Sequence, residues 1–462
     1  MKHKTKVQNS LSRRDFLKKS AIASLGSSSL FSLISQFNLA NAQTSGLSDY
    51  RALVCVFLYG GNDAYSMLIP HSQSEYNSYS DTRRNLAIPR SQIIPVSPLN
   101  SQPADYGLHP ELSDIANLFG NNKLSFVNNI GTLIEPTSRL DYINKRVALP
   151  PQLFSHNDQQ NFVMSLQATK PQQGWASRMA ELMMDANGTT NLAMNISLSG
   201  ANTFQMGGTQ SPYTLSAGGV SEYWSIRPQS TEAWDINRVA AYRKILDQDQ
   251  SHLFAQAFAD TQNRSLLLGQ EVSSALELVS PLTTEFDLSS RLSASLRMVA
   301  NLIAARSSLG MNRQIFFVGI GDYDTHGDQA NRYPTLMREL NHSLTSFYNA
   351  TEELGVADKV TTFTASDFGR TLTSNGDGTD HGWGSHQMIM GGAVDGGKFF
   401  GTMPELAIGS NDDIGEGRII PTTSVDQYAA SLAGWYGLSQ SQISETFPNL
   451  ANFNAQTLGL FT

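Results

Sequence analysis

Short apolar runs alternate with longer segments of helical periodicity along most of the chain. The apolar runs have the length of strands and lie at 52–58, 123–128, 192–198, 314–320, 359–364 and 387–390. Apolar residues recur with helical spacing over 234–261, 285–307 and 330–354. Near-continuous apolar strands are typical of parallel sheets that are buried on both faces. The alternation therefore predicts an α/β fold with a central, mostly parallel sheet flanked by helices.

Residues 199–230 interrupt this alternation. They are rich in Gly, Ser, Thr and Pro, which favour turns and irregular backbone. No sequence unit recurs at a fixed period of roughly 20 to 50 residues, so the pattern does not indicate a repeat architecture. We therefore predict a single domain over residues 43–462 with a loop-rich insertion near 200–230.

The first 42 residues have the parts of a twin-arginine (Tat) export signal. Arg13 and Arg14 are followed by a weakly apolar stretch over 21–40, and Ala-Asn-Ala at 40–42 supplies small residues for cleavage. Six serines make the stretch too polar for a stable transmembrane helix. The sequence predicts a signal peptide over 1–42, passage through the Tat translocon, no stable membrane insertion after cleavage, and a periplasmic or extracellular location. A basic tail on a cytosolic protein is the alternative.

Charge is distributed unevenly between these 42 residues and the rest of the chain. The formal net charge is −8, yet the first 42 residues hold seven basic residues and one acidic residue. The following 420 residues hold 25 basic and 39 acidic residues, a net charge of −14. Such an acidic body lacks the positive patch that nucleic acids or anionic membranes require. The single cysteine, Cys55, excludes an intramolecular disulfide and a cysteine-only metal cluster.

Carboxylates follow several of the predicted strands. Asp63 comes after the first apolar run, Asp322 and Asp324 follow the fourth, and Asp367 follows the fifth. The carboxyl ends of parallel strands share one edge of a sheet, so these acids would crowd their negative charges together. A single aspartate at a strand end is more often a turn residue or a helix cap. Together, however, the four acids predict a site that binds cations.

Histidines occur close to these carboxylates in the sequence. His326 follows Asp322 with the spacing Asp-x-x-x-His, and Asp380, His381 and His386 lie just before the last apolar run. Imidazole nitrogens combined with carboxylate oxygens suit zinc, manganese or iron better than calcium. The sequence therefore predicts a shared metal site, with these residues and the strand-end acids as candidate ligands.

Four short segments resemble the exported domain-of-unknown-function 1501 family. They are Gly-Gly-Asn-Asp at 60–63, Tyr-Asp-Thr-His-Gly-Asp-Gln at 323–329, Ser-Asp-Phe-Gly-Arg-Thr at 366–371 and Gly-Thr-Asp-His-Gly at 378–382. With the leader, the resemblance extends to near Pro448. That family resembles the alkaline phosphatase-like superfamily, which includes sulfatases and phosphatases. The resemblance implies a central sheet flanked by helices and, in many superfamily members, a pair of divalent metal ions.

The resemblance also implies roles for individual residues. Asp63 matches the metal-binding acid that ends the first strand of the superfamily. Asp322 and His326 match an Asp-x-x-x-His pair that serves one metal ion, and His381 resembles the late histidine of that site. Asp367 matches the acid of an Asp-His pair that serves the other metal ion.

One departure from the superfamily pattern affects the second metal site. The residue after Asp367 is Phe368 rather than histidine, so this site lacks a ligand unless Asp380 or His386 replaces it. An alternative alignment makes Asp380 and His381 the Asp-His pair and His386 the late histidine. That alignment leaves Asp367 without a role, and we prefer the first.

The superfamily's nucleophile stands at a helix start between the first acid and the later ligands. Ser138 is the best positional candidate, activated by metal coordination, with Arg139 near enough to clamp an oxyanion. A serine there is at least equally well explained as a helix cap. His156, within Ser-His-Asn-Asp-Gln-Gln at 155–160, could contact a leaving group or complete the second site. The alternative is a loop histidine that bonds to local backbone.

These patterns favour an exported metal-dependent hydrolase of phosphate or sulfate esters. Its cofactors would be two divalent metal ions, most simply zinc or manganese, and its substrate an anionic small molecule or glycan. The competing hypothesis is a non-catalytic exported protein that binds a glycan or an envelope partner through a degenerate metal site. Phe368 favours the second hypothesis, and the acids and histidines at several strand ends favour the first.

Overall fold

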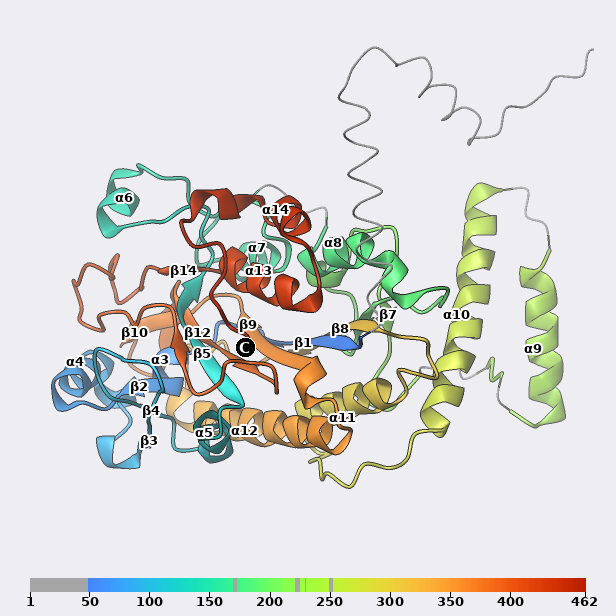
Figure 1. Cartoon of the computed structure of the whole chain (residues 1–462), viewed down its shortest axis with the longest axis horizontal. Coiled ribbons are helices and arrows are strands. Elements are labelled where there is room, and N and C mark those ends of the chain that lie inside the picture. Colours follow the sequence, from blue (N-terminus) through green and yellow to red (C-terminus); the bar gives the residue numbers. More distant parts are fainter. Residues whose placement is uncertain (1–48, 169–172, 221–224, 229, 249–251) are drawn as a thin grey trace, which may run out of the picture. The chain divides into compact units, whose positions relative to one another are not determined.

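A nine-stranded sheet forms the centre of the part of the chain that the structure describes (Figure 1). The structure is a computed structural model and describes residues 49–168, 173–220, 225–228, 230–248 and 252–462. The strand order is β13-β5-β12-β9-β1-β8-β6-β7, and β14 pairs with β5. The strands are β1 (Arg51–Leu58), β5 (Leu124–Gly131), β6 (Asn195–Ser197), β7 (Tyr213–Thr214), β8 (Arg313–Ile320), β9 (Val360–Ser366), β12 (Ser385–Met390), β13 (Phe399–Phe400) and β14 (Thr423–Ser424).

The direction of the strands determines which residues share an edge of the sheet. β1 pairs in parallel with β8 and β9, so that Leu58 lies beside Ile320 on one side and Ser366 on the other. β12 pairs antiparallel with both β5 and β9. The start of β12 therefore lies at the edge where β1, β8 and β9 end. The predicted α/β class with a mostly parallel sheet is confirmed.

Helices cover both faces of this sheet because the central strands are apolar on both sides. Six of the eight β1 residues are less than 2% exposed, and its first residue alone is partly exposed. One face is covered by α5 (Ser113–Gly120), α11 (Arg291–Ala304) and α12 (Gln329–Glu353). The other is covered by α7 (His156–Ser165), α8 (Trp175–Leu182), α13 (Val425–Tyr436) and α14 (Gln440–Thr446). In α11, the helical spacing of Leu292, Leu296, Val299 and Ile303 places four fully buried side chains on one stripe.

Smaller elements surround the main sheet. A three-stranded sheet has the order β2-β4-β3, and β10 pairs with β11 in a hairpin. The strands of the small sheet are β2 (Leu68–Pro70), β3 (Ile94–Val96) and β4 (Tyr106–Leu108), and those of the hairpin are β10 (Arg370–Ser374) and β11 (Thr379–His381). The short α-helices are α3 (Ala64–Met67), α4 (Gln73–Arg83) and α6 (Arg139–Asn144). The 3-10 helices are η1 (Arg84–Leu86), η2 (Arg90–Gln92), η3 (Met184–Asn187), η4 (Thr203–Gln205), η5 (Ala357–Lys359) and η6 (Pro448–Asn452).

The helix expected over 234–261 is two helices. α9 (Ala233–Leu246) and α10 (Leu253–Glu277) pack against each other as a hairpin (Figure 1). The break has a local cause, because the His252 side chain accepts a hydrogen bond from the Phe254 backbone N–H and caps the start of α10. Of the expected insertion, the described residues hold only η4 and β7 as regular elements, together with irregular backbone.

The predicted signal peptide, residues 1–42, lies outside the described residues. The residues from Asp49 to Thr462 pack as one unit. Within the described ranges, each helix is either too short or too polar to span a bilayer.

Candidate metal centre

Loops at one edge of the main sheet bring three potential ligands together. Asp324 follows β8, His381 ends β11, and His156 is the first residue of α7. One ligand atom from each of these residues lies within 4.8 Å of the other two. His326, two residues after Asp324, lies against the same group, with its Nε2 3.1 Å from Asp324 Oδ1. We call these four residues the His–Asp cluster.

His381 faces the cluster with an unprotonated nitrogen. Its Nδ1 lies 2.7 Å from the Phe154 carbonyl oxygen, which can only accept, so Nδ1 carries the hydrogen. Burial lowers the pKa of His381, although the bond to Phe154 opposes that effect. The ring is therefore neutral near pH 7, and the lone pair of Nε2 points to Asp324 Oδ1 at 3.5 Å.

His156 has the same arrangement with a different outer partner. Its Nδ1 lies 2.7 Å from Asp367 Oδ2, and its Nε2 lies 3.5 Å from Asp324 Oδ2. The hydrogen bond to Asp367 raises the pKa of His156, and burial opposes that shift. Nε2 is buried and has no hydrogen-bond partner among the described residues. A buried ring nitrogen without a partner is costly unless a proton or a cation occupies it.

His326 completes the pattern from the exposed side of the cluster. Its Nδ1 lies 2.9 Å from Asp380 Oδ1, so a neutral ring directs the Nε2 lone pair inward. Nε2 of His326 and Nε2 of His381 are 2.9 Å apart. Two lone pairs at this separation repel each other. A cation shared between them, or a proton on one ring, removes that repulsion.

Asp324 is held in its charged form. Burial alone would raise its pKa, but the hydrogen bond and the charge of Arg370 outweigh burial, and the pKa of Asp324 is lowered. Arg370 Nη1 lies 2.6 Å from Asp324 Oδ1 and also donates to the Gly60 carbonyl at 3.0 Å. Gly60 has a φ of +116°, and a Cβ there would lie 2.3 Å from the Asp324 backbone nitrogen. Glycine therefore permits the turn after β1 to approach the turn after β8.

The wall behind the histidines is aromatic and acidic. The Phe368 ring packs 4.9 Å from the His156 ring and 4.8 Å from the His381 ring, centroid to centroid. Asp367 Oδ2 accepts hydrogen bonds from His156, from Gln160 Nε2 at 2.9 Å and from the Gly60 backbone N–H at 3.2 Å. Asp367 thus orients His156, and Phe368 fills the position expected for a histidine of a second metal site.

Asp63 and Asp322, two of the predicted strand-end ligands, do not contact the cluster histidines in any hydrogen bond or ion pair among the described residues. The buried Asp63 carboxylate pairs with Arg83 and accepts a hydrogen bond from Gln329 Nε2, so both of its oxygens have partners. Asp322 has a φ of +74° and a side chain that is 84% exposed, with Arg332 Nη2 3.9 Å away. The left-handed backbone at Asp322 points its side chain to solvent. The structure therefore places Asp324, rather than Asp322, beside His326.

His386 lies in the core instead of the cluster. Its ring is buried in β12, where Nδ1 accepts a hydrogen bond from the Asn129 backbone N–H at 3.2 Å. The ring also meets Tyr65 edge to face, 5.2 Å between centroids. Burial lowers the pKa of His386 to about 3, so the ring is neutral. The structure thus gives no support to His386 as a replacement ligand, whereas Asp380 contacts the cluster through His326.

Ser138 and Arg139 have other partners at the start of α6. Ser138 is the N-cap of this helix, and its Oγ accepts a hydrogen bond from the Asp141 backbone N–H at 3.2 Å in a capping box. Arg139 Nε donates to the Asp413 carbonyl at 2.7 Å. Among the described residues, none of the bonds of these two side chains reaches the His–Asp cluster. Their predicted catalytic roles stay predictions.

The sequence does not assign a specific role to four groups that the structure places in or directly around the His–Asp cluster. Asp324 is one of the strand-end acids that predict a cation site, but the resemblance gives it no role, and the sequence does not single out Arg370, Gln160 or the Phe154 carbonyl. A signal existed only for Asp324, which is separated from His326 by one residue. The roles of the other three depend on contacts between distant segments, which spacing does not reveal.

The geometry of the cluster fits a small divalent cation. A tetrahedral ion with bonds of about 2.0–2.1 Å to nitrogen and oxygen has ligand atoms about 3.3 Å apart. Four separations between inward-facing atoms are 2.9 to 3.5 Å, and the ligand atoms of His156, Asp324 and His381 all lie within 4.8 Å of one another. Each histidine has its other nitrogen fixed by an acceptor, as is usual for metal-bound histidines. Three nitrogens and one carboxylate are a donor set that suits zinc.

Comparison with models of protein families finds a match to a family of unknown function. The family model described as "Protein of unknown function (DUF1501)" matches residues 50–447. No protein with a curated description matches the chain.

Several solved structures are distantly similar in fold. The PsFucS1 sulfatase from Pseudoalteromonas sp. is 10% identical, with a TM-score of 0.35 over 88% of this chain and 72% of that chain. The C-terminal periplasmic domain of EcEptC from Escherichia coli, in complex with Zn, is 10% identical, with a TM-score of 0.32 over 86% and 84%. The lipoteichoic acid synthase LtaP from Listeria monocytogenes is 7% identical, with a TM-score of 0.32 over 87% and 78%.

Proposed function

The chain belongs to the DUF1501 family of proteins of unknown function, and we propose from its own site that it is a metal-dependent hydrolase of phosphate or sulfate esters. His156, Asp324, His326 and His381 would hold a divalent metal ion, with zinc or manganese as the best candidates. From the twin-arginine pattern, we further propose that it acts in the periplasm or outside the cell.

One observation carries this proposal. Three imidazole rings direct Nε2 toward a single charged carboxylate, while an acceptor holds each Nδ1. The buried Nε2 of His156 has no hydrogen-bond partner among the described residues and lies 3.5 Å from Asp324 Oδ2, so it needs a proton or a cation. A bound cation satisfies all of these lone pairs at once.

The chemistry follows from the charges in the site. A divalent ion bound there polarises an anionic ester and lowers the pKa of water. Asp324 would be the only carboxylate among the proposed ligands, with the Arg370 guanidinium beside it and the Asp367 and Asp380 carboxylates behind the histidines. Arg370 keeps Asp324 ionised, and Asp367 fixes the ring of His156. The described residues support one such site, and a second ion stays a prediction.

The proposal is tested by metal analysis and hydrolysis with a matched pair of variants. Asp324→Asn removes the shared carboxylate, whereas Asp322→Asn changes the same residue type two positions away at an exposed side chain. After chelation and reloading with zinc or manganese, wild type and Asp322→Asn are expected to bind the ion and to hydrolyse an aryl phosphate or an aryl sulfate. Asp324→Asn is expected to lose both properties while keeping its circular dichroism spectrum.

Thermal unfolding gives a second readout that does not depend on the choice of substrate. An ion present at a hundred times its Kd stabilises the folded state by about 2.7 kcal/mol. This stabilisation should appear in wild type and be absent from Asp324→Asn. A wild-type protein that binds no stoichiometric metal and shows no melting shift would contradict the proposal. Metal binding without hydrolysis of either ester would favour the non-catalytic hypothesis instead.

A further inference from the structure

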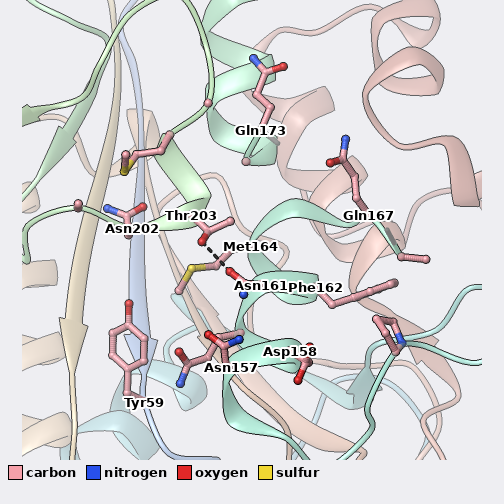
Figure 2. A pocket seen from close by; sticks show the side chains of 17 residues that line it. Tyr59, Asn157, Asp158, Asn161, Phe162, Met164, Gln167, Gln173, Asn202 and Thr203 are labelled. Atoms are coloured by element: carbon pink, nitrogen blue, oxygen red, sulfur yellow. Dashed lines mark hydrogen bonds between the residues drawn. The ribbon is translucent and has the colours of Figure 1, made fainter. Parts of the chain in front are cut away.

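A cleft with a volume of about 860 Å³ adjoins the first turns of α7 (Figure 2). Sites for small molecules commonly have volumes of about 300–1,000 Å³, so the cleft is large enough for a ligand of several rings. Its walls come from α7, from the turn after β1 and from the segments around Gln173 and Asn202. None of the four residues of the His–Asp cluster lines it.

One face of α7 supplies a polar wall. Asn157, Gln160, Asn161 and Met164 line the cleft, with the spacing of residues that share one side of a helix. Thr203 Oγ1 donates to Asn161 Oδ1 at 2.8 Å, which orients this amide (Figure 2). The Asn161 Nδ2 group and the Asn157 amide make no hydrogen bond with another described residue. They are therefore available to a ligand.

The described lining of the cleft is rich in amides and poor in charge. Apolar groups of Phe162, Met164 and Met206 accompany the amides, and Tyr59 enters from the end of β1. Asp158 is the one charged residue of this lining. Lysine and arginine do not occur among the described lining residues. The amides of the lining are Asn157, Gln160, Asn161, Gln167, Gln173 and Asn202.

The cleft and the His–Asp cluster share a wall. Gln160 lines the cleft and donates its Nε2 to Asp367 Oδ2, the atom that also holds His156 Nδ1. His156 and Asn157 are consecutive residues in the first turn of α7. The Gln160 side chain therefore lies between the cleft and the Asp367 carboxylate that holds His156.

We propose that this cleft binds the uncharged, polyhydroxylated part of a sugar ester whose anionic group lies at the His–Asp cluster. The position of the ester rests on the proposed function, whereas binding of the sugar itself does not. An amide presents a donor and an acceptor side by side, which matches a pair of adjacent sugar hydroxyls. The Tyr59 ring and the methionines offer surface to the C–H face of a sugar ring. Extended peptides also bond to amides, so they are the competing ligand.

Direct binding tests the cleft without any hydrolysis. The probes are an array of neutral oligosaccharides and, for comparison, a set of uncharged tetrapeptides, both applied to the mature protein with and without zinc. We expect saturable binding of at least one oligosaccharide, and Asn157→Leu and Asn161→Leu should each raise its Kd about tenfold or more. Asn117→Leu, which changes an exposed amide on α5, is the control and should leave the Kd unchanged.

The outcomes separate this inference from the proposed function. Asp324→Asn should still bind the sugar, and the two cleft variants should still bind zinc, because the two sites use different residues. The Asn157 side chain makes no hydrogen bond with another described residue, so its substitution tests the cleft even if Asn161→Leu fails to fold. Absence of oligosaccharide binding, preferential binding of peptides, or unchanged affinity in Asn157→Leu would overturn the sugar assignment. A wild type that binds sugar but does not bind a stoichiometric divalent metal ion would overturn only the proposed function.

Discussion

Asp63 and Asp324 follow neighbouring parallel strands, yet their charges are balanced in different ways. Asp63 is completely buried, and its partners are the equally buried guanidinium of Arg83 and the amide of Gln329. Asp324 is 44% exposed at its side chain and lies among three imidazole nitrogens. Arg370 contacts only one of its oxygens.

This difference shows how one sheet edge holds a structural carboxylate beside a carboxylate that we propose as a metal ligand. At Asp63 the counter-charge is part of the chain, so no additional cation is needed. At Asp324 the Arg370 guanidinium contacts one carboxylate oxygen, and the inward-facing nitrogens of His326 and His381, 2.9 Å apart, still need a cation or a proton between them. The partners of a strand-end acid, rather than its position, decide its role.

The largest expected effect comes from breaking the buried pair. Arg83→Met leaves Asp63 charged and buried without its counter-charge, which should lower the free energy of unfolding by about 3–5 kcal/mol. Denaturant unfolding of the metal-free protein measures this loss. Arg338→Met is the control, because its pair with Glu111 is exposed and should contribute less than about 1 kcal/mol. Equal losses in the two variants would contradict the structural role of Asp63.

A substitution at the outer hydrogen-bond partner of His326 tests the proposed metal site around Asp324. Asp380→Asn weakens the acceptor that holds His326 Nδ1, and loss of such outer partners typically lowers metal affinity about 10–100-fold. Competition with a fluorescent chelator measures this change. Asp377→Asn is the control, because it changes an aspartate of the same hairpin whose carboxylate accepts a hydrogen bond from the Asp328 backbone N–H and does not hold a proposed ligand. If both variants bind zinc as wild type does, His326 is not a ligand.

His386 extends the comparison to a buried imidazole. Its pKa is lowered to about 3 by burial, while that of an unfolded histidine is about 6.5. Between these values the unfolded chain binds a proton that the folded protein does not, so stability falls as the pH falls. The loss is about 1.4 kcal/mol per pH unit, or about 2 kcal/mol at pH 5. His386→Gln, measured with chelator present, should lose less stability than wild type between pH 7 and pH 5, and parallel profiles would contradict this.

The fold could be predicted where burial dictates the pattern. The apolar runs at 52–58 and 314–320 are β1 and β8 almost to the residue, because strands buried on both faces admit few polar residues. The direction of β12 could not be predicted, since the sequence of a strand does not encode its partner. This antiparallel direction is what brings His381 to the edge where the parallel strands end.

The candidate site could be predicted as a set of segments but not atom by atom. His156, His326, His381 and Asp380 were all candidates, and the structure brings them together around Asp324. The choice between Asp322 and Asp324 depends on one left-handed backbone conformation. The resemblance favoured the aspartate with the familiar spacing, and spacing cannot show which of two nearby side chains turns outward.

Ser138 lies outside both carboxylate regions and gives the smallest expected effect. As the N-cap of α6 it satisfies the Asp141 backbone N–H, and replacement of a capping serine by alanine typically costs about 1 kcal/mol. Ser138→Ala should therefore lower stability by about that amount while zinc affinity and ester hydrolysis stay at wild-type values. Ser439→Ala, which removes the matching cap of α14, shows the cost of a cap alone. If hydrolysis disappears only in Ser138→Ala, this serine is the nucleophile that the resemblance implies, and α6 must then move toward the His–Asp cluster during the reaction.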